Sequence, residues 1–430
     1  MSQTQKTQYG SQFALVGELL RWTPVAVVVG VMGGAASAVL LWSLNVATEV
    51  REAHRWMIWL LAPVGGCVGL LYKHFGKEVE AGNNLILDEV HEPKKTIKLR
   101  MTPFILIGTF LTHLFGGSAG REGTAIQTGA SLADQLTKPL GLNAAGRRVL
   151  LMAGISAGFA SVFGTPLAGA VFGLEVLAVG SLSYEAIAPC FVSAFAGDMV
   201  THALLKSVHM GHTVYTVTEV PALSVMRLLT AMLAGAVFGL MAMFFARTTH
   251  AVASLAKTKI KRPELRPVVG GLLVSCAVFA LGTTRYIGLG VPVIQESFVH
   301  QVHPWDFFVK SLFTSVTLGT GFKGGEVTPL FYIGATLGNA LSHVLPLPAS
   351  LLAGMGFVAV FAGAANTPIA SSLMAVELFG AEAGAFAAIA CVGSYLFSGR
   401  TGIYHAQRAG VGKRLPAALA AKVEETVQEK

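Results

Sequence analysis

An arginine and a glutamate stand side by side between glycines in GREGT, residues 120–124, directly after residues 101–119, which contain no Lys, Arg, Asp or Glu. If a helix begins here inside the membrane, its first amide N–H groups have no partners in the helix, and such groups attract anions. Glu122 is then a tethered anion that competes for the site, and protonation would release it. The motif predicts a carboxylate that both gates an anion and carries a proton. The alternative is a structural ion pair between Arg121 and Glu122 at a helix end.

The stretch GFKGGEVTP, residues 321–329, repeats this arrangement with a glycine-rich run, a carboxylate, a threonine and a proline. A turn that frees the amides of Glu326 and Val327 would form a second anion-binding site. Pro329 suits the first turn of a following helix. The alternative is a glycine-rich bend where two helices pack.

Two further stretches contain polar side chains that could face an anion. In GNNLILDEV, residues 82–90, Asn83 or Asn84 could cap a short helix, or one side-chain amide could donate to an anion. In SGRTGIYHAQR, Tyr404 could belong to an interfacial aromatic belt, or its hydroxyl could donate in a pore. The local sequence leaves both pairs of alternatives open.

The composition indicates where these motifs lie. Of 430 residues, 53% are hydrophobic and 13% are charged, with a mean hydropathy of +0.62. These values predict an all-α polytopic membrane protein. The first long apolar stretch, residues 24–44, follows a mixed polar segment that does not resemble a signal peptide. Basic residues gather in connectors such as HEPKKTIKLR, so we expect cytoplasmic connectors and termini, and no nucleic-acid partner.

Several other functions are disfavoured by the sequence. GGSAGREG is rich in glycine but lacks the GK[ST] of a phosphate loop, and the twelve histidines show no metal-ligand spacing. We therefore expect no cofactor and no metal. The four cysteines, far apart and without a CxxC, are predicted to be core residues: Cys67, Cys190, Cys276 and Cys391.

Apolar segments follow one another along the whole chain. They span residues 22–48, 56–72, 101–118, 146–163, 165–180, 185–205, 221–247, 265–282, 305–320, 328–345, 349–362, 368–379 and 382–398. Several are shorter than the roughly 20 residues that a helix needs to cross a bilayer. Short apolar helices interrupted by Gly and Pro predict broken or re-entrant helices around an enclosed cavity.

An internal repeat divides the chain into two homologous halves. GTPLAGAVFGLEV, residues 164–176, matches NTPIASSLMAVEL, residues 366–378, and GREGT matches GGEVT. We predict that the repeated glutamates, Glu175 and Glu377, are structural and accept hydrogen bonds from neighbouring groups. The expected organisation is an N-terminal segment, two repeat halves and a charged tail, at residues 1–20, 21–207, 208–408 and 409–430. An inverted repeat would place a binding site at the interface between the halves.

At GREGT, GGEVTP and the TPLAG/TPIAS pair, the chain resembles the CLC family of anion channels and proton-coupled antiporters, over nearly its whole length. It looks most like the bacterial fluoride-exporting branch. The resemblance implies a CLC-type inverted repeat with broken and re-entrant helices, and a homodimer with one pore per subunit. It implies that Glu122 is the gating glutamate, followed by Thr124 where chloride-type members carry proline. Asn83 takes the position of the chloride-type serine.

The same resemblance assigns roles in the second half. Glu326, Val327 and Thr328 match positions that face the central anion site, and Tyr404 matches the pore tyrosine in a register consistent with a short C-terminal helix. Val176 stands where chloride/proton antiporters carry an inner proton glutamate. Glu326 is therefore the candidate for a second proton-linked group.

The function that the resemblance implies is fluoride/proton antiport, exporting fluoride across the bacterial inner membrane and conferring fluoride resistance. Fluoride holds water tightly, so its site needs strong donors, which Asn83, Thr328, Tyr404 and backbone N–H groups can supply. One alternative is a CLC-type chloride/proton antiporter or passive anion channel. Another is a membrane enzyme that uses Glu122 and Glu326 as a carboxylate pair. The repeat symmetry of the two glutamates and the lack of a nearby nucleophile or metal cluster argue against the enzyme.

Overall fold

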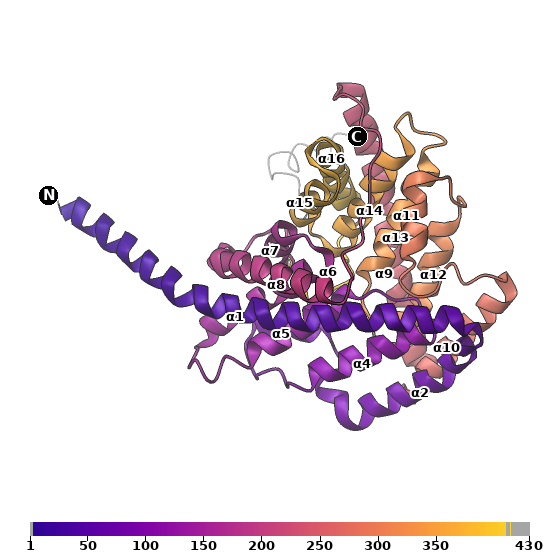
Figure 1. The fold of residues 1–430 in the computed structure, drawn as a ribbon, viewed down its shortest axis with the longest axis horizontal. Coiled ribbons are helices and arrows are strands. Elements are labelled where there is room, and N and C mark those ends of the chain that lie inside the picture. Colours follow the sequence, from indigo (N-terminus) through magenta and orange to yellow (C-terminus); the bar gives the residue numbers. More distant parts are fainter. Residues whose placement is uncertain (1–2, 410–412, 414–430) are drawn as a thin grey trace, which may run out of the picture.

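The chain folds into a bundle of helices that differ widely in length (Figure 1). The structure is a computed structural model that describes residues 3–409 and 413, so most of the predicted tail at 409–430 lies outside the described residues. The α-helices are α1 (Gln3–Ala53), α2 (Leu61–Leu71), α3 (Asn83–His91), α4 (Met101–Leu114), α5 (Glu122–Asp134), α6 (Ala144–Phe163), α7 (Pro166–Glu175), α8 (Ile187–Ser207), α9 (Val225–Lys259), α10 (Arg266–Leu281), α11 (Val291–Val299), α12 (Asp306–Gly319), α13 (Val327–Leu341), α14 (Ala349–Ala365), α15 (Pro368–Phe379) and α16 (Ala381–Phe397).

Short elements connect these helices. They are the 3₁₀ turns at Arg55–Leu60, Lys77–Val79, Tyr184–Ala186 and Pro263–Leu265, a π turn at Tyr72–Gly76, and the strands β1 (Ala178–Val179) and β2 (Arg408–Ala409). The two strands pair in parallel, with Ala178 opposite Arg408. This pairing brings the segment after α16 back to the end of α7.

Within the described residues, six helical stretches are long and apolar enough to cross a membrane. These are Val16–Ala53, Arg55–His91, Ala144–Phe163, Tyr184–Ser207, Val225–Lys259 and Pro263–Leu281. Other apolar helices, α4, α7, α14, α15 and α16, have only 10–17 residues. They are shorter than the roughly 20 helical residues that a typical span needs.

Element boundaries differ from the predictions where the helices leave the apolar zone. Helix α9 runs to Lys259 and α1 begins at Gln3, although the apolar segments suggested 221–247 and 22–48. Hydropathy marks the apolar part of a helix and not its polar extensions. The short helix α11 was not predicted at all, because its nine residues follow glycines and begin with Val-Pro.

The helices of the two halves correspond in order, with α5 to α8 matching α13 to α16. In each half the first two of these helices pack closely through glycines. A Cβ at Gly129 of α5 would lie 2.3 Å from the Gly154 carbonyl oxygen of α6, and a Cβ at Gly334 of α13 would lie 2.0 Å from the Gly356 carbonyl oxygen of α14. Glycine at these positions lets the helix backbones approach one another.

Glutamates of each half cap a helix of the other half. The amides of Leu167 and Ala168, at the start of α7, donate to the Glu377 carboxylate at 2.8 Å each. The equivalent amides at the start of α15 donate to Glu175 at 3.0 and 2.8 Å. A carboxylate at a helix N-terminus satisfies free amides and interacts favourably with the helix dipole. The predicted structural role of both glutamates as hydrogen-bond acceptors is confirmed.

The four cysteines divide into two classes. Cys190 and Cys391 are buried, whereas Cys67 and Cys276 are exposed, and all four are free thiols. The prediction of four core residues is therefore wrong for Cys67 and Cys276. In an apolar helix the residue types that face lipid and those that face protein are too similar for the sequence to separate them.

The reciprocal caps make a prediction about stability. Replacing Glu175 with alanine leaves two α15 amides without an acceptor, which costs about 1–3 kcal/mol. We expect Glu175→Ala to lower the midpoint of thermal unfolding in detergent, followed by tryptophan fluorescence. Glu185→Ala is the control, because Glu185 is half exposed and pairs with Arg148 at the surface, a contact worth at most about 1 kcal/mol. Equal midpoints for the two variants would contradict the capping role.

Candidate functional site

The two glycine-rich loops meet and pair with each other. The Gly120 amide donates to the Gly325 carbonyl at 2.6 Å, and the Gly325 amide donates to the Gly120 carbonyl at 2.8 Å. A Cβ at Gly325 would lie 2.6 Å from the Gly123 nitrogen, so only glycine allows this approach. The bridge brings together the N-terminus of α5, at Glu122, and the N-terminus of α13, at Val327.

The Glu122 side chain crosses from its own helix to the other one. Its carboxylate accepts hydrogen bonds from the Thr328 amide at 2.9 Å and from the Thr328 hydroxyl, and from the Arg121 amide at 3.1 Å. Glu122 is fully buried. The first amides of α13 have no partners within that helix. A carboxylate therefore occupies the place at this helix end where an anion would bind.

The ion pair between the Arg121 guanidinium and the Glu122 carboxylate is a loose one. Its Nε atom lies 3.7 Å from the Glu122 carboxylate and has no hydrogen-bond partner among the described residues. The hydrogen bonds of Glu122 come instead from Thr328 and from backbone N–H. The guanidinium adds positive charge beside the carboxylate without fixing its geometry.

Buried side chains hold the loop before α5 and the neighbouring residues 286–288 in place. The Ser118 amide donates to Thr317 at 3.1 Å, and His113 Nε2 lies 3.0 Å from the Ala119 carbonyl oxygen. Lys310 is completely buried and donates to the carbonyls of Tyr286 at 3.1 Å and Gly288 at 2.8 Å. The sequence analysis missed Lys310. A single lysine inside the apolar segment 305–320 was the signal that could have identified it.

Asn83 lies beside the first turn of α5. Helix α3 begins at Asn83 with Gly82 as its N-cap residue, and no side chain caps it. The capping interpretation of the two asparagines is wrong, because Gly82 (φ 59°) holds the cap position and Asn84 accepts from the Ala406 amide at 3.0 Å. The Asn83 Nδ2 atom lies 2.9 Å from the place that a Cβ on Gly123 would occupy. Its Oδ1 atom is buried without a partner in the described part of the chain.

Tyr404 lies inside the protein in an irregular segment that runs back across the helices. It is 5% exposed, and its hydroxyl has no partner among residues 16–408. The interpretation as an interfacial belt residue is wrong, since such a residue would lie at the surface. Residues 401–407 form turns and irregular structure, and the expected short C-terminal helix lies outside the described residues. The Ile403 amide instead donates to the Ala364 carbonyl at 2.9 Å, which holds the segment against the end of α14.

A small cavity joins Asn83 to Tyr404. It has a volume of about 10 Å³ and is lined by Asn83, Ile86, Leu87, Ile126, Ile155, Phe172, Val176 and Tyr404. This volume is close to the minimum that one water-sized species needs. Two lining residues carry polar side chains, and both have a buried polar atom without a described partner. A small species that accepts or donates hydrogen bonds would fit between them.

The remaining predicted site residues lie at the start of α13. Val327 and Thr328 are buried, and Glu326 is the partly buried N-cap residue next to the Gly325 bridge. The structure thus brings together Glu122 with Thr328, and Asn83 with Tyr404. Asn83 connects the two pairs through its contact with the first turn of α5.

Comparison with known proteins places the chain in a family. Residues 64–399 match the family model described as voltage gated chloride channel. The chain belongs to this family, the CLC family. A "Chloride/fluoride channel protein" of Pseudomonas syringae pv. tomato is 55% identical over 417 residues, covering 96% of this chain and 91% of the relative. The ClcB chloride channel of Salmonella typhi is 27% identical over 64% of this chain and 67% of the relative.

Solved CLC structures share the fold. A crystal structure of a CLC-type fluoride/proton antiporter superimposes with a TM-score of 0.87 at 33% identity, covering 91% of this chain and 99% of the other. A slow cyanobacterial Cl⁻/H⁺ antiporter has a TM-score of 0.74 at 21% identity, over 88% and 94% of the two chains, and shows the same fold. The predicted fold class is confirmed as an all-α, multi-pass membrane protein with the CLC inverted repeat.

The bridge between the glycine loops makes a prediction about transport. In Gly325→Ala the added Cβ collides with the start of α5, so the ends of α5 and α13 must separate. We expect anion efflux from proteoliposomes to fall at least about tenfold per folded molecule, since a displacement of about 1 Å can cost a site roughly 100-fold. Gly211→Ala is the matched control, because a Cβ there meets nothing within 4 Å. Unchanged efflux in Gly325→Ala would show that this bridge does not set the site.

Proposed function

We propose that this CLC protein is a fluoride/proton antiporter that exports fluoride across the bacterial inner membrane and confers fluoride resistance. The observation that carries the proposal is the Glu122 carboxylate, which occupies the anion position at the N-terminus of α13 and accepts from the amide and hydroxyl of Thr328. The structural relative described as a fluoride/proton antiporter and the relative named a chloride/fluoride channel protein support it.

The geometry couples an anion to a proton through one side chain. The charged form of Glu122 accepts the Thr328 hydrogen bonds and blocks the site. A protonated Glu122 has lost its charge and part of its capacity to accept, so an anion can replace it at the helix end. When that anion leaves, the carboxylate returns and releases its proton. An anion and a proton therefore exchange at one place. They move in opposite directions when the proton reaches Glu122 from the side to which the anion leaves and is released to the side from which the anion came.

The donors around the site suit fluoride. This anion is small and holds its hydration shell tightly, so the protein must replace that shell with well-directed N–H and O–H groups. Thr328 supplies an amide and a hydroxyl, Asn83 supplies its Nδ2 donor and Tyr404 supplies a buried hydroxyl. The cavity between Asn83 and Tyr404 has room for a species of about the size of water.

We assign Glu326 as a second proton-linked group. Val176, at the position of the inner glutamate of chloride-type members, is buried in the wall of the small cavity, and its side chain cannot bind a proton. Glu326 is partly exposed and follows the Gly325 bridge directly. A proton could therefore reach the anion site through Glu326 without crossing the cavity wall.

The family resemblance supports a homodimer with one pore per subunit, in the inner membrane with both termini cytoplasmic. Large apolar side chains are exposed on α15 and α16, including Ile369, Val392 and Leu396. A partner subunit or lipid would cover them. A chloride-type antiporter or passive anion channel is the second candidate function, favoured by the more distant relatives named as chloride channels. The named relatives are channels or transporters, which disfavours an enzyme that uses the two glutamates.

The first experiment measures transport by the wild-type protein and two variants. Proteoliposomes are loaded with equal fluoride and chloride, and ion-selective electrodes and a pH electrode follow the outside medium. We expect fluoride efflux well above chloride efflux, with protons moving inward. Glu122→Ala should abolish this coupled exchange, and Asn83→Ser should slow fluoride efflux because it changes the donor beside Gly123. Rapid chloride efflux with little preference for fluoride would establish the chloride-type alternative.

The second experiment tests Glu326. Replacing its carboxyl group with an amide removes a proton-binding group while retaining a similar shape. We expect Glu326→Gln to slow fluoride efflux or to change the ratio of fluoride to protons. Glu382→Gln is the control, because Glu382 is exposed in the first turn of α16. If Glu326→Gln retains both the wild-type flux and the wild-type ratio, Glu326 is not proton-linked.

A further inference from the structure

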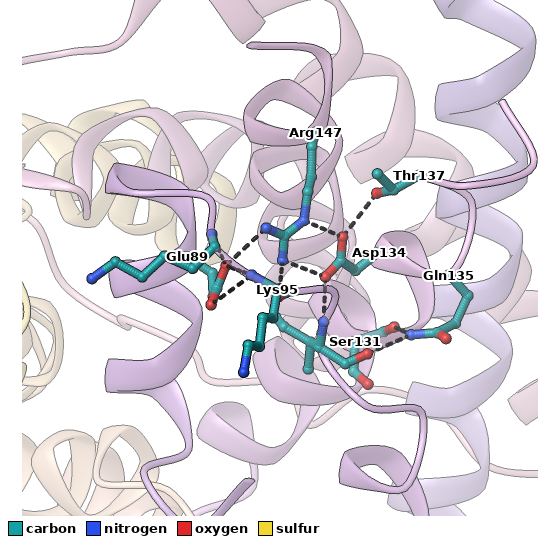
Figure 2. Close-up of polar contacts among 9 residues, drawn as sticks. Glu89, Lys95, Ser131, Asp134, Gln135, Thr137 and Arg147 are labelled. Carbon is teal, nitrogen blue, oxygen red and sulfur yellow. Dashed lines mark hydrogen bonds and ion pairs between the residues drawn. The ribbon is translucent and has the colours of Figure 1, made fainter. Parts of the chain in front are cut away.

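A buried arginine ties together the far ends of the two helices that begin at the anion site. Helix α3 begins at Asn83 and carries Glu89 in its last turn, and α5 begins at Glu122 and ends at Asp134. Figure 2 shows Arg147, from the first turn of α6, between the carboxylates of Glu89 and Asp134. Neither carboxylate belongs to the site described above.

The guanidinium makes four hydrogen bonds in this cluster. Its Nε and Nη2 atoms donate to the two oxygens of Asp134, each at 2.7 Å, and Nη1 donates to Glu89 at 2.8 Å. Nη2 also donates to the Lys95 carbonyl at 2.7 Å. Arg147 is 5% exposed. This planar, bidentate geometry fixes both direction and distance, which a lysine in its place could not do.

The two carboxylates also hold the connection between α3 and α4. Asp134 accepts from the Ile97 amide at 2.7 Å and from the Thr137 hydroxyl at 2.8 Å. Glu89 accepts from the Lys94 amide at 2.8 Å. Figure 2 shows Glu89, Asp134 and Thr137 grouped around the arginine. The α3 end, the α5 end and the connecting loop therefore form one unit around Arg147.

The positive charge of Arg147 keeps the two carboxylates of this unit together. Glu89 and Asp134 are buried carboxylates at the C-terminal ends of their helices, where the helix dipole disfavours negative charge. Removing one member of a buried, hydrogen-bonded charge cluster leaves the others uncompensated. Without Arg147, two carboxylates would repel each other at the place where α3 and α5 are now joined.

The two helices are short enough to transmit such a change. Helix α3 has nine residues and α5 has 13, so their lengths are about 13 and 20 Å. Both pack on α6, which carries the arginine. A rotation of either helix at its Arg147 end therefore displaces its N-terminus, where Asn83 meets the first turn of α5.

We infer that Arg147 is a positioning residue of the anion site. From the opposite ends of α3 and α5 it holds the Asn83 side chain and the Glu122 helix terminus at the spacing that anion binding requires. Arg147 does not bind the anion itself. The inference rests on the proposed function for the identity of the anion. The connection of α3 and α5 through Arg147 rests on the structure alone.

Arg148 provides a matched control in the next position. It lies on the same helix turn, is about one-third exposed, and pairs with Glu185 at 2.8 Å on the surface. Arg148→Gln removes the same charge from the same helix. It leaves the bonds of Arg147 to α3 and α5 in place.

The test uses the full chain in detergent and compares Arg147→Gln, Arg147→Lys and Arg148→Gln with the wild type. Hydrogen exchange, measured by mass spectrometry without fluoride, reports on peptides that contain residues 82–86 and 122–126. Isothermal titration calorimetry with sodium fluoride gives the Kd. For Arg147→Gln we expect faster exchange in both peptides and a Kd at least tenfold higher per folded molecule. Arg147→Lys should be intermediate, and Arg148→Gln should match the wild type.

A purely structural role gives a different result. If Arg147→Gln lowers the thermal midpoint while exchange in both peptides and the fluoride Kd stay at wild-type values, the inference is overturned. If Arg147→Gln does not fold, Arg147→Lys decides by the same two readouts. If the wild type binds no fluoride, the proposed function fails, whereas exchange in the two peptides still tests whether Arg147 positions the helix ends.

Discussion

The structure depends on how two helix N-termini are satisfied inside the membrane. Helices α5 and α13 begin at a backbone bridge between Gly120 and Gly325, and their first amides have no partners in their own helices. In a medium without water, unsatisfied amides are costly, so an anionic group at this place is strongly favoured. Glu122 supplies that group in this structure. Under the proposed function, the gating carboxylate and the transported anion are alternative occupants of the same helix end, and this explains why a carboxylate stands in an otherwise apolar stretch.

Glutamates accept hydrogen bonds from helix N-termini at several places in the fold, but they are held in different ways. Glu175 and Glu377 cap helices of the opposite half through two backbone amides each, and both lie late in helices whose backbones hold them in place. Glu122 lies at the first position of its helix, in a loop with glycines, and accepts from the amide and hydroxyl of Thr328 across the bridge and from the Arg121 amide of its own loop. A carboxylate held by two amides from a regular helix is a fixed part of the fold. Under the proposed function, one that begins a helix beside glycines leaves and returns.

Local sequence patterns predict part of the fold and of the candidate site. The apolar segments, the internal repeat and the Glu122 motif each depend on residues that are close in sequence or related by the repeat. The Arg147 cluster was missed because its partners lie 58 and 13 residues away and meet only in the folded chain. Gly82, which precedes Asn83 and Asn84, adopts a positive φ and is itself the N-cap residue. The residue types alone do not reveal which of the three residues takes the cap position. For Tyr404 the sequence showed an aromatic residue near an apolar helix, but burial depends on the strand pairing that folds the segment back onto α7.

Under the proposed function, the position of Glu326 explains why the chain can carry Val176 where chloride-type members carry an inner glutamate. Glu122 and Glu326 lie just after the two bridged glycines, at matching positions of the repeat. They are not equivalent, because Glu122 is fully buried and bonded across the bridge, whereas Glu326 is partly exposed at the cap of α13. The buried carboxylate competes with the anion, and the partly exposed one can exchange protons with water. With both groups at one bridge, a proton need not pass Val176. The apolar wall around Val176 is therefore compatible with antiport and keeps the small cavity for the anion alone.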